Sequence, residues 1–401
     1  MLTPAEATIA QIARLTSIDT TSRESNLELV DLVVEQLAAV GVEPVLVPDP
    51  TGAKANVLAT FPAADGSIRG GIALSAHTDV VPVDGQEWSS HPFEPQVRDG
   101  RLYARGSADM KSFLGVILAK LPDVAAASLA EPIHLALSYD EEVGCVGARD
   151  LVDEIVRRDL QPRGCVVGEP TSMQVVRGHK SIDVLRADFH GVAAHSSLPT
   201  QGVNAIAAAA ELVRFVHGIA AELRDEGPFD EAYIVPYTTM TVNRIDGGIA
   251  VNTIPAECSV HLEYRALTTV DREALTERIR AEAHRLEAAM REQDDRAGVD
   301  FSVTATAPGV DTHADAAIVA LAEEWGGAPS PAKVTYATEA GIFARAGIPT
   351  VVCGPGDIAQ AHAPDEYIEL EQIAQCESFV DRLVAGLRLP AGAVDPPIPA
   401  E

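Results

Sequence analysis

An apolar run over residues 71–76 leads directly into His77, Thr78 and Asp79, and Pro82 stops the extended segment. The length and composition of the run predict a buried β-strand. In open α/β sheets, ligands bind just beyond the carboxyl ends of the strands, so His77 is placed to face a site. Asp79 lies on the same side of an extended chain as His77 and can fix the imidazole tautomer. A surface turn with two polar residues is the simpler interpretation of this stretch alone.

Strand-like and helix-like segments alternate along the first 170 residues. Helical periodicity covers residues 4–18, 24–40, 109–121 and 147–158, and strands are predicted over 42–47, 55–61, 71–76, 100–105, 133–138 and 165–167. The pattern returns after residue 312, with a helix to residue 324, a strand over 350–353 and a helix near 370–385. This alternation predicts an α/β fold with a mixed, mostly parallel sheet flanked by helices.

The middle of the chain has a different texture. Alternating strands are predicted over 181–189, 238–245, 259–266 and 301–306, with helices over 203–216 and 271–293. The resulting order of strand, helix, strand, strand, helix and strand is that of a ferredoxin-like α+β domain. We therefore predict a discontinuous α/β domain of residues 1–178 and 309–401, with residues 179–308 inserted as a second domain. The Pro-rich tail, 391–401, is predicted to be frayed.

The composition restricts the class of partner. Thirty basic and 59 acidic residues give a formal net charge of −29, which argues against nucleic acid and anionic membranes. No apolar run is long enough to span a bilayer, and the first residues lack the pattern of a signal peptide. Five scattered cysteines without a CxxC pair fit reduced thiols, so we expect a cytoplasmic protein.

Further acids and a second histidine follow other predicted strands. Asp109 stands at a loop-to-helix junction, residues 140–142 are Asp-Glu-Glu directly after an apolar strand, Glu169 follows the strand at 165–167, and His362 follows the strand at 350–353. Each is more often a helix cap or a solvated loop residue when taken alone. Together they offer the nitrogen and carboxylate ligands that zinc accepts. The carboxylates of Asp109, Glu142 and Glu169 carry three negative charges. Together with one hydroxide they would balance the four positive charges of two divalent cations.

These motifs resemble the co-catalytic zinc peptidases and deacylases, the family that includes glutamate carboxypeptidase. The resemblance covers nearly the whole chain. It rests on the sequences at 77–79, 108–111, 140–144, 168–171 and 193–197. The sequences at 337–343 and 353–366 look most like those of the acetylornithine deacetylases within that family. The resemblance implies a zinc-dependent amidohydrolase that removes the acetyl group from N2-acetyl-L-ornithine in arginine biosynthesis, giving L-ornithine and acetate.

The resemblance also implies a role for each residue at the predicted metal centre. Asp109 would bridge two Zn2+ ions per subunit, with Co2+ or Mn2+ as alternatives. His77 and Glu169 would complete one site, and Glu142 and His362 the other. Asp79 would orient His77, and the bond between Asp109 and Met110 would be cis. Glu141 would be the general base, held beside the attacking water rather than bound to a metal; a carboxylate there can carry the proton from water to the leaving amine.

In the inserted domain, the resemblance implies a lid that also forms a homodimer. His195 would reach the partner's active site and stabilise the oxyanion, and Asn243 and Arg265 would contact the small-molecule N-acyl amino acid. A salt bridge from Arg265 to Glu263 or Glu257 is the structural alternative. Two further substrate contacts would come from outside the insertion, Thr338 and Glu339, with Glu339 receiving the ornithine ammonium.

One departure from the family pattern concerns the substrate. Acetylornithine deacetylases usually read Gly-His-Lys-Gly-Lys where this chain has Gly-His-Lys-Ser-Ile-Asp at residues 178–183. A related deacylase or dipeptidase with another substrate is therefore the main alternative. A two-metal phosphoesterase is disfavoured because no glycine-rich phosphate cradle or cationic cluster accompanies the ligands. A non-catalytic metal-binding relative is disfavoured because Glu141 and all the expected ligands are present.

Overall fold

The computed structural model describes residues 2–390, which divide into two compact units. Unit 1 contains the chain up to Gly178, then Thr312–Pro331, and the chain from Thr338 onward. Unit 2 contains His179–Asp311 and the short segment Ala332–Ala337. The predicted tail, 391–401, lies outside the described residues.

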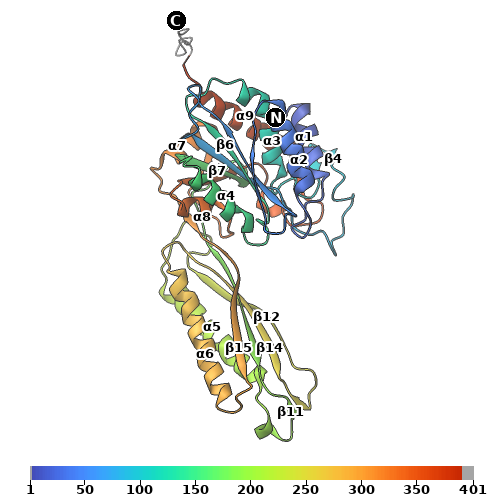
Figure 1. Cartoon of the computed structure of the whole chain (residues 1–401), viewed down its shortest axis with the longest axis vertical. Helices are drawn as coiled ribbons and strands as arrows, with labels where there is room; N and C mark the ends of the chain where they lie inside the picture. The colour runs from blue at the N-terminus through green and yellow to red at the C-terminus, as the bar shows by residue number, and fades with distance from the viewer. Residues whose placement is uncertain (1, 391–401) are drawn as a thin grey trace. The chain divides into compact units, whose positions relative to one another are not determined.

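Unit 1 is built around a six-stranded sheet, of which Figure 1 labels β6 and β7, with the strand order β1-β2-β6-β3-β7-β18. The strands are β1 (Val45–Pro48), β2 (Ala55–Phe61), β3 (Ile72–His77), β6 (Ile133–Ser138), β7 (Gly164–Pro170) and β18 (Thr350–Gly354). β6, β3, β7 and β18 are parallel, whereas β1 and β2 pair in antiparallel fashion. The carboxyl ends of four neighbouring strands therefore share one edge of the sheet.

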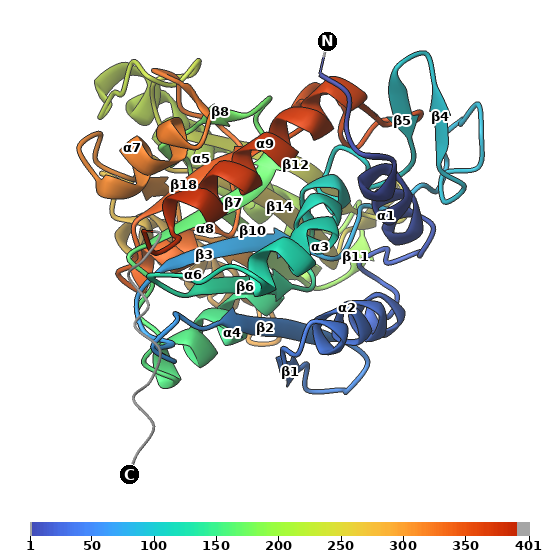
Figure 2. The ribbon, with the colours of Figure 1, turned by 90° about the horizontal axis from the view of Figure 1, so that it is seen from above.

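Helices cover both faces of this sheet, as Figure 2 shows from above. They are α1 (Glu6–Thr16), α2 (Leu27–Ala39), α3 (Lys111–Ala125), α4 (Val146–Arg157), α7 (Ala317–Glu324), α8 (Ala340–Arg345) and α9 (Leu370–Gly386). Successive side chains of β3 point to opposite faces of the sheet. Ile72 and Leu74 join the core with Phe113 of α3 on one face. Ser75, on the other face, donates a hydrogen bond to Glu339, the residue that precedes α8. The predicted fold class is confirmed: a mixed, mostly parallel sheet flanked by helices.

Unit 2 is a four-stranded antiparallel sheet with two long helices packed on it (Figure 1). Its elements follow the predicted order: β10 (Ile182–His190), α5 (Ala205–Glu226), β12 (Thr239–Gly247), β14 (Glu257–Arg265), α6 (Arg272–Arg291) and β15 (Gly298–Ala307). The sheet order is β12-β14-β10-β15, so β12 and β15 are its edges. Every second residue of β10, including Leu185 and Phe189, is buried against the helices.

Several elements differ from the sequence prediction. α5 continues to Glu226 rather than ending at residue 216. α7 begins at Ala317 rather than at residue 312, because Thr312 is held by the carbonyls of Arg177 and Thr350. α8 was not predicted.

The remaining short elements are β4 (Gln96–Arg98), β5 (Arg101–Tyr103), β8 (Gln174–Val175), β9 (Gly178–His179), β11 (Ala194–His195), η1 (Pro199–Gln201), β13 (Thr253–Ile254), β16 (Val310–Asp311), β17 (Ala328–Pro329), η2 (Ile358–Gln360) and β19 (Tyr367–Glu369). Within residues 2–390, no helix is both long and apolar enough to span a membrane.

Candidate active site

The predicted ligands meet at the carboxyl edge of the unit 1 sheet. His77 is the last residue of β3, and Glu169 lies near the end of β7. Glu142 lies in the loop after β6, and His362 lies in the loop after β18. Asp109 lies two residues before α3 begins. Five side chains that are distant in the sequence thus come together because four parallel strands end side by side.

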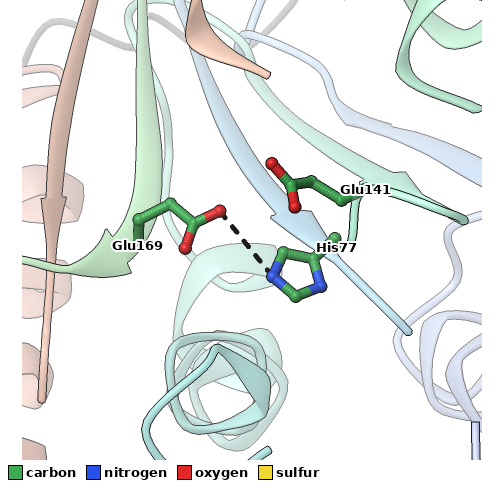
Figure 3. A group of neighbouring side chains, drawn as sticks. All are labelled: His77, Glu141 and Glu169. Carbon is green, nitrogen blue, oxygen red and sulfur yellow. Dashed lines mark ion pairs between the residues drawn. The ribbon is translucent and has the colours of Figure 1, made fainter. Parts of the chain in front are cut away.

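The carboxylate of Asp109 lies between the two histidines. Its Oδ1 atom is 2.9 Å from His77 Nε2, and its Oδ2 atom is 3.3 Å from His362 Nε2. His362 Nε2 is also 3.0 Å from Glu142 Oε2. On the other side, His77 Nε2 is 3.7 Å from Glu169 Oε1 (Figure 3). One carboxylate with a histidine at each oxygen is the arrangement that a bridging ligand between two metal ions requires.

The donor set fits metal ions. Ligand atoms of His77, Asp109 and Glu142 lie within 4.8 Å of one another, and so do those of His77, Glu141 and Glu169. Figure 3 shows the carboxylates of the second group near the imidazole ring. Glu142 Oε1 is buried and has no hydrogen-bond partner among residues 2–390, although buried polar atoms are normally paired. Imidazole nitrogen and carboxylate oxygen are ligands that zinc and related divalent ions accept.

Burial of so many acids perturbs their protonation. Burial raises the pKa of Glu142 to about 7 and the pKa values of Glu141 and Glu169 well above the usual range. Hydrogen bonds to Asp109 and Glu142 raise the pKa of His362 to about 10. Burial opposes the ionisation of Asp109, but hydrogen bonds from the two histidines outweigh it and lower the pKa of that carboxyl. Metal binding replaces such protons, because ligands bind a metal ion in their deprotonated forms.

Asp79 is fully buried behind this cluster and serves two segments. Its backbone carbonyl is 2.9 Å from His77 Nδ1, whereas its carboxylate is 3.6 Å from the same atom. The carboxylate accepts hydrogen bonds from the backbone N–H groups of Glu141 and Glu142, at 3.0 and 3.3 Å, and from the Ser22 hydroxyl at 2.7 Å. The main chain of Asp79 thus orients the imidazole, and its side chain holds the loop that carries the two glutamates.

Other contacts support the loop after β6. The Lys54 ammonium pairs with Asp140 and also donates to the Ser22 carbonyl. The Cys145 thiol donates to Glu141 Oε1 at 3.3 Å. The peptide bond between Asp109 and Met110 is cis, as the family resemblance implies.

The predicted substrate contacts are divided between the units. His195, Asn243 and Arg265 belong to unit 2. Arg265 Nε lies 3.4 Å from Glu263 Oε1, so the structural alternative of an ion pair is present, and both side chains are partly exposed. His195 is exposed, with Nδ1 2.8 Å from the Ser197 hydroxyl.

Thr338 and Glu339 belong to unit 1, and both are fully buried. The two carboxylate oxygens of Glu339 accept hydrogen bonds from the hydroxyls of Ser75 and Ser138, at 2.5 and 2.6 Å. Burial raises the pKa of this carboxyl. Whether either residue contacts a substrate stays a prediction.

Sequence reasoning missed the residues that support the ligands. Ser22, Lys54, Gln86 and Arg105 carry no signal in the sequence, because they contact the site only after distant segments are brought together. Glu366 is part of the motif that contains His362, and its acidic side chain next to a predicted ligand was the available signal.

Comparisons with known proteins agree with this geometry. A family model described as peptidase family M20/M25/M40 matches residues 73–386. The acetylornithine deacetylase of Proteus mirabilis (strain HI4320) is 33% identical over 371 residues, which cover 92% of each chain. That of Myxococcus xanthus is 36% identical over 383 residues, covering 94% of this chain and 96% of the relative.

Solved structures share the fold at lower identity. A tripeptidase from Staphylococcus aureus superposes with a TM-score of 0.72 at 21% identity, covering 96% of this chain and 99% of the other. Human carnosine dipeptidase 1 also gives a TM-score of 0.72, at 15% identity, with 95% and 96% covered. A dinuclear metal-binding M20 peptidase from Bacillus subtilis gives 0.65 at 16% identity, with 95% and 97% covered. The family match and the ligand cluster lead to one conclusion: this chain belongs to peptidase family M20/M25/M40 and is a metal-dependent hydrolase of amide bonds.

Proposed function

We propose that this protein removes the acetyl group from N2-acetyl-L-ornithine, giving acetate and L-ornithine, as a step in arginine biosynthesis. The observation that carries the proposal is the similarity to relatives named acetylornithine deacetylase, at 33–36% identity over at least 90% of this chain. The five cysteines are free and buried, which fits the reducing cytoplasm in which we expect the protein to work.

We further propose two Zn2+ ions per subunit as the cofactor. Asp109 would bridge them, His77 and Glu169 would bind one, and Glu142 and His362 would bind the other. The support is the pair of contacts from Asp109, at 2.9 Å to one histidine and 3.3 Å to the other. When bound, two such ions polarise the amide carbonyl and lower the pKa of a water molecule.

The remaining steps belong to the side chains. Glu141 takes a proton from the attacking water as the water oxygen bonds to the carbonyl carbon. The same carboxyl then gives this proton to the nitrogen, the carbon–nitrogen bond breaks, and the amine leaves with acetate as the second product. A raised pKa suits a group that must hold a proton between these two steps, and burial raises the pKa of Glu141. Potential ligand atoms of Glu141, His77 and Glu169 lie within 4.8 Å of one another, so the test must separate a base from a metal ligand.

Unit 2 is proposed to act as a lid and as the surface of a homodimer. His195 would donate a hydrogen bond to the oxyanion in the partner's active site, and Asn243 and Arg265 would contact the substrate. The support for His195 is its exposure together with an Nε2 atom that has no hydrogen-bond partner within the described part of the chain. Arg265 suits a carboxylate because its planar guanidinium makes two parallel hydrogen bonds.

Thr338 and Glu339 are proposed as further substrate contacts from unit 1. For Glu339, an opening of its serine contacts would be needed before it could receive the ornithine ammonium. A Glu339→Gln variant should then lose acetylornithine hydrolysis and spare hydrolysis of N-acetyl-methionine, which has no side-chain ammonium. Equal losses on both substrates would assign Glu339 a structural role.

The substrate proposal is tested by comparing kcat/KM for acetylornithine, acetylcitrulline, succinyl-diaminopimelate and a dipeptide on protein reconstituted with zinc. Acetylornithine should give the highest value. A higher value for another substrate would favour the second candidate, a related deacylase or dipeptidase. Residues 178–183 motivate that candidate, because Ser181 and Ile182 stand where the family pattern has Gly and Lys.

A further inference from the structure

The side chain of Glu366 is buried and accepts four hydrogen bonds. Its Oε1 atom accepts from the backbone N–H groups of Ala108 and Asp109, at 2.8 and 3.1 Å. Its Oε2 atom accepts from Arg105 Nη1 at 2.6 Å and from the backbone N–H of Gly106 at 3.1 Å. Since only 1% of Glu366 is exposed, water does not replace these contacts.

These contacts join two segments that each carry a predicted metal ligand. All four donors belong to residues 105–109, which end at Asp109, whereas Glu366 stands four residues after His362. A second link runs through Arg105, whose Nη2 donates to Gln86 Oε1 at 2.7 Å. Gln86 Nε2 in turn donates to the backbone carbonyl of His362 at 3.0 Å.

His362 depends on such links more than the other ligands do. Its side chain is 53% exposed, whereas that of His77 is completely buried. It lies in a loop and has a left-handed backbone with φ of 60°. Packing therefore does little to fix the 3.3 Å separation between His362 Nε2 and Asp109 Oδ2.

We propose that Glu366 is a positioning residue that sets the spacing between Asp109 and His362. It thereby sets the metal affinity of the site formed by Asp109, Glu142 and His362. This inference rests on the proposed dinuclear centre. Residues beyond the ligands that orient them typically change metal affinity 10–100-fold when replaced.

The chemistry of the site defines the informative substitution. Each oxygen of Glu366 faces two N–H donors, so both oxygens must be hydrogen-bond acceptors, as they are in a carboxylate. Glu366→Gln keeps the shape but places an NH2 group against two donors. Glu369→Gln is the matched control, because Glu369 also pairs with an arginine, at 2.8 Å from Arg101 Nε, but its side chain is 41% exposed.

The experiment titrates metal-free full-length protein with Co2+ and follows binding by visible absorption and calorimetry, without substrate. The wild type should bind two ions, and His362→Ala identifies which event belongs to the site with His362. Glu366→Gln should weaken that event about 10–100-fold and leave the other close to its wild-type affinity. Glu369→Gln should match the wild type in both.

Four results would overturn the inference or the proposal on which it rests. Two events with wild-type affinities in Glu366→Gln would remove any positioning role, and equal weakening of both events would indicate general damage to the fold. A wild type that binds a single ion would instead overturn the dinuclear proposal on which the inference rests. If Glu366→Gln does not fold, as judged by circular dichroism and thermal unfolding, Gln86→Ala decides: it should weaken only the event that His362→Ala removes, and an unchanged event would overturn the inference.

Discussion

Glu141 and Glu142 are neighbours in the chain but meet different partners. Glu142 Oε2 lies 3.0 Å from His362 Nε2, and these two residues are the proposed ligands of the same metal ion. Glu141 Oε1 accepts a hydrogen bond from the Cys145 thiol and makes no ion pair with either histidine in the described chain. Both backbone N–H groups are held by Asp79, which fixes the direction in which each side chain leaves the loop.

Replacing Glu141 by Gln should lower kcat by about 10²–10⁴-fold while leaving metal content unchanged, because the proton carrier is removed and the ligands remain. Metal analysis of the purified variant and its kcat provide the measurement. Glu142→Gln is the contrasting variant and should lose metal. If Glu141→Gln also loses metal, Glu141 is a ligand; if it keeps both metal and activity, it is not the base.

His179, the first residue of unit 2, has a pKa well below the ordinary value of a histidine. Its ring is completely buried and contacts the Lys180 carbonyl through Nδ1 at 2.8 Å. Burial lowers its pKa from 6.5 to about 4. As pH falls, the unfolded chain therefore binds a proton before the folded chain does.

The stability contributed by neutral His179 should be present above pH 6.5 and lost as the pH falls toward about 4. A His179→Asn variant, which retains a side-chain N–H, should lose less stability between pH 7 and pH 4.5 than the wild type, by about 2 kcal/mol. Urea unfolding at the two pH values measures this difference. His217→Asn on the exposed side of α5 serves as the control, and identical pH dependence in all three proteins would contradict the prediction.

At the scale of elements, β7 and α3 approach so closely that a glycine is required between them. A Cβ atom at Gly168 would lie 2.0 Å from Cδ1 of the Phe113 ring. The next residue is the proposed ligand Glu169, so any shift of β7 also moves the proposed metal centre. Close packing at this position therefore connects the core to the site.

Gly168→Ala should destabilise the protein by about 1–3 kcal/mol, because the added methyl group overpacks the core. Thermal and urea unfolding of the metal-free protein measure the loss. Combining it with Phe113→Leu should recover part of the stability relative to the sum of the two single variants. Gly218→Ala in α5 is the control: a Cβ there has no neighbour within 4 Å, so higher helix propensity should leave stability equal or raised. A neutral Gly168→Ala would show that the contact relaxes freely.

At the scale of the whole molecule, unit 2 exposes an apolar surface at its edge strand. Ile245 in β12 is 49% exposed, and Ile249 and Val251 in the following turn are almost fully exposed. Edge strands and apolar patches of this kind are typical of interaction sites. They support the proposed homodimer through unit 2.

Changing Ile249 and Val251 together to Asp should shift the protein from dimer to monomer, as measured by sedimentation velocity. Ile234→Asp is the control, because this residue of unit 2 is also 90% exposed but lies outside the proposed surface. If His195 acts in the partner's site, mixed dimers of Glu141→Gln and His195→Ala chains should regain activity, since one site then has both residues. A monomeric wild type, or no regained activity in mixed dimers, would contradict the respective part of the proposal.

Much of the fold was predictable because periodicity is a local property. The strands at 55–61 and 133–138 were predicted with the bounds that β2 and β6 have, since each is a short apolar run between turns. Elements that lack a strong local pattern were missed: α8 has six residues, too few to display a helical period. The start of α7 was placed too early because tertiary hydrogen bonds hold Thr312 outside the helix.

Which residues are available for chemistry can be read from the amino-acid sequence alone. Histidines and acids placed after apolar strands predict a site at the edge of a parallel sheet, and the family motifs suggest the ligand assignment. These features are encoded within a few residues of each strand end, so they are visible without a structure.

How those residues are held depends on the folded structure. That Asp109 faces one histidine with each oxygen depends on the side-by-side order of β3, β7 and β18, in which β7 lies between two strands that are far apart in the sequence. The same holds for Asp79, whose carboxylate supports the Glu141–Glu142 loop more directly than it supports His77. Glu366 has a defined partner set only because the chain brings residues 105–109 against it. Hydrogen bonds over such separations depend on three-dimensional distance, which sequence spacing does not contain.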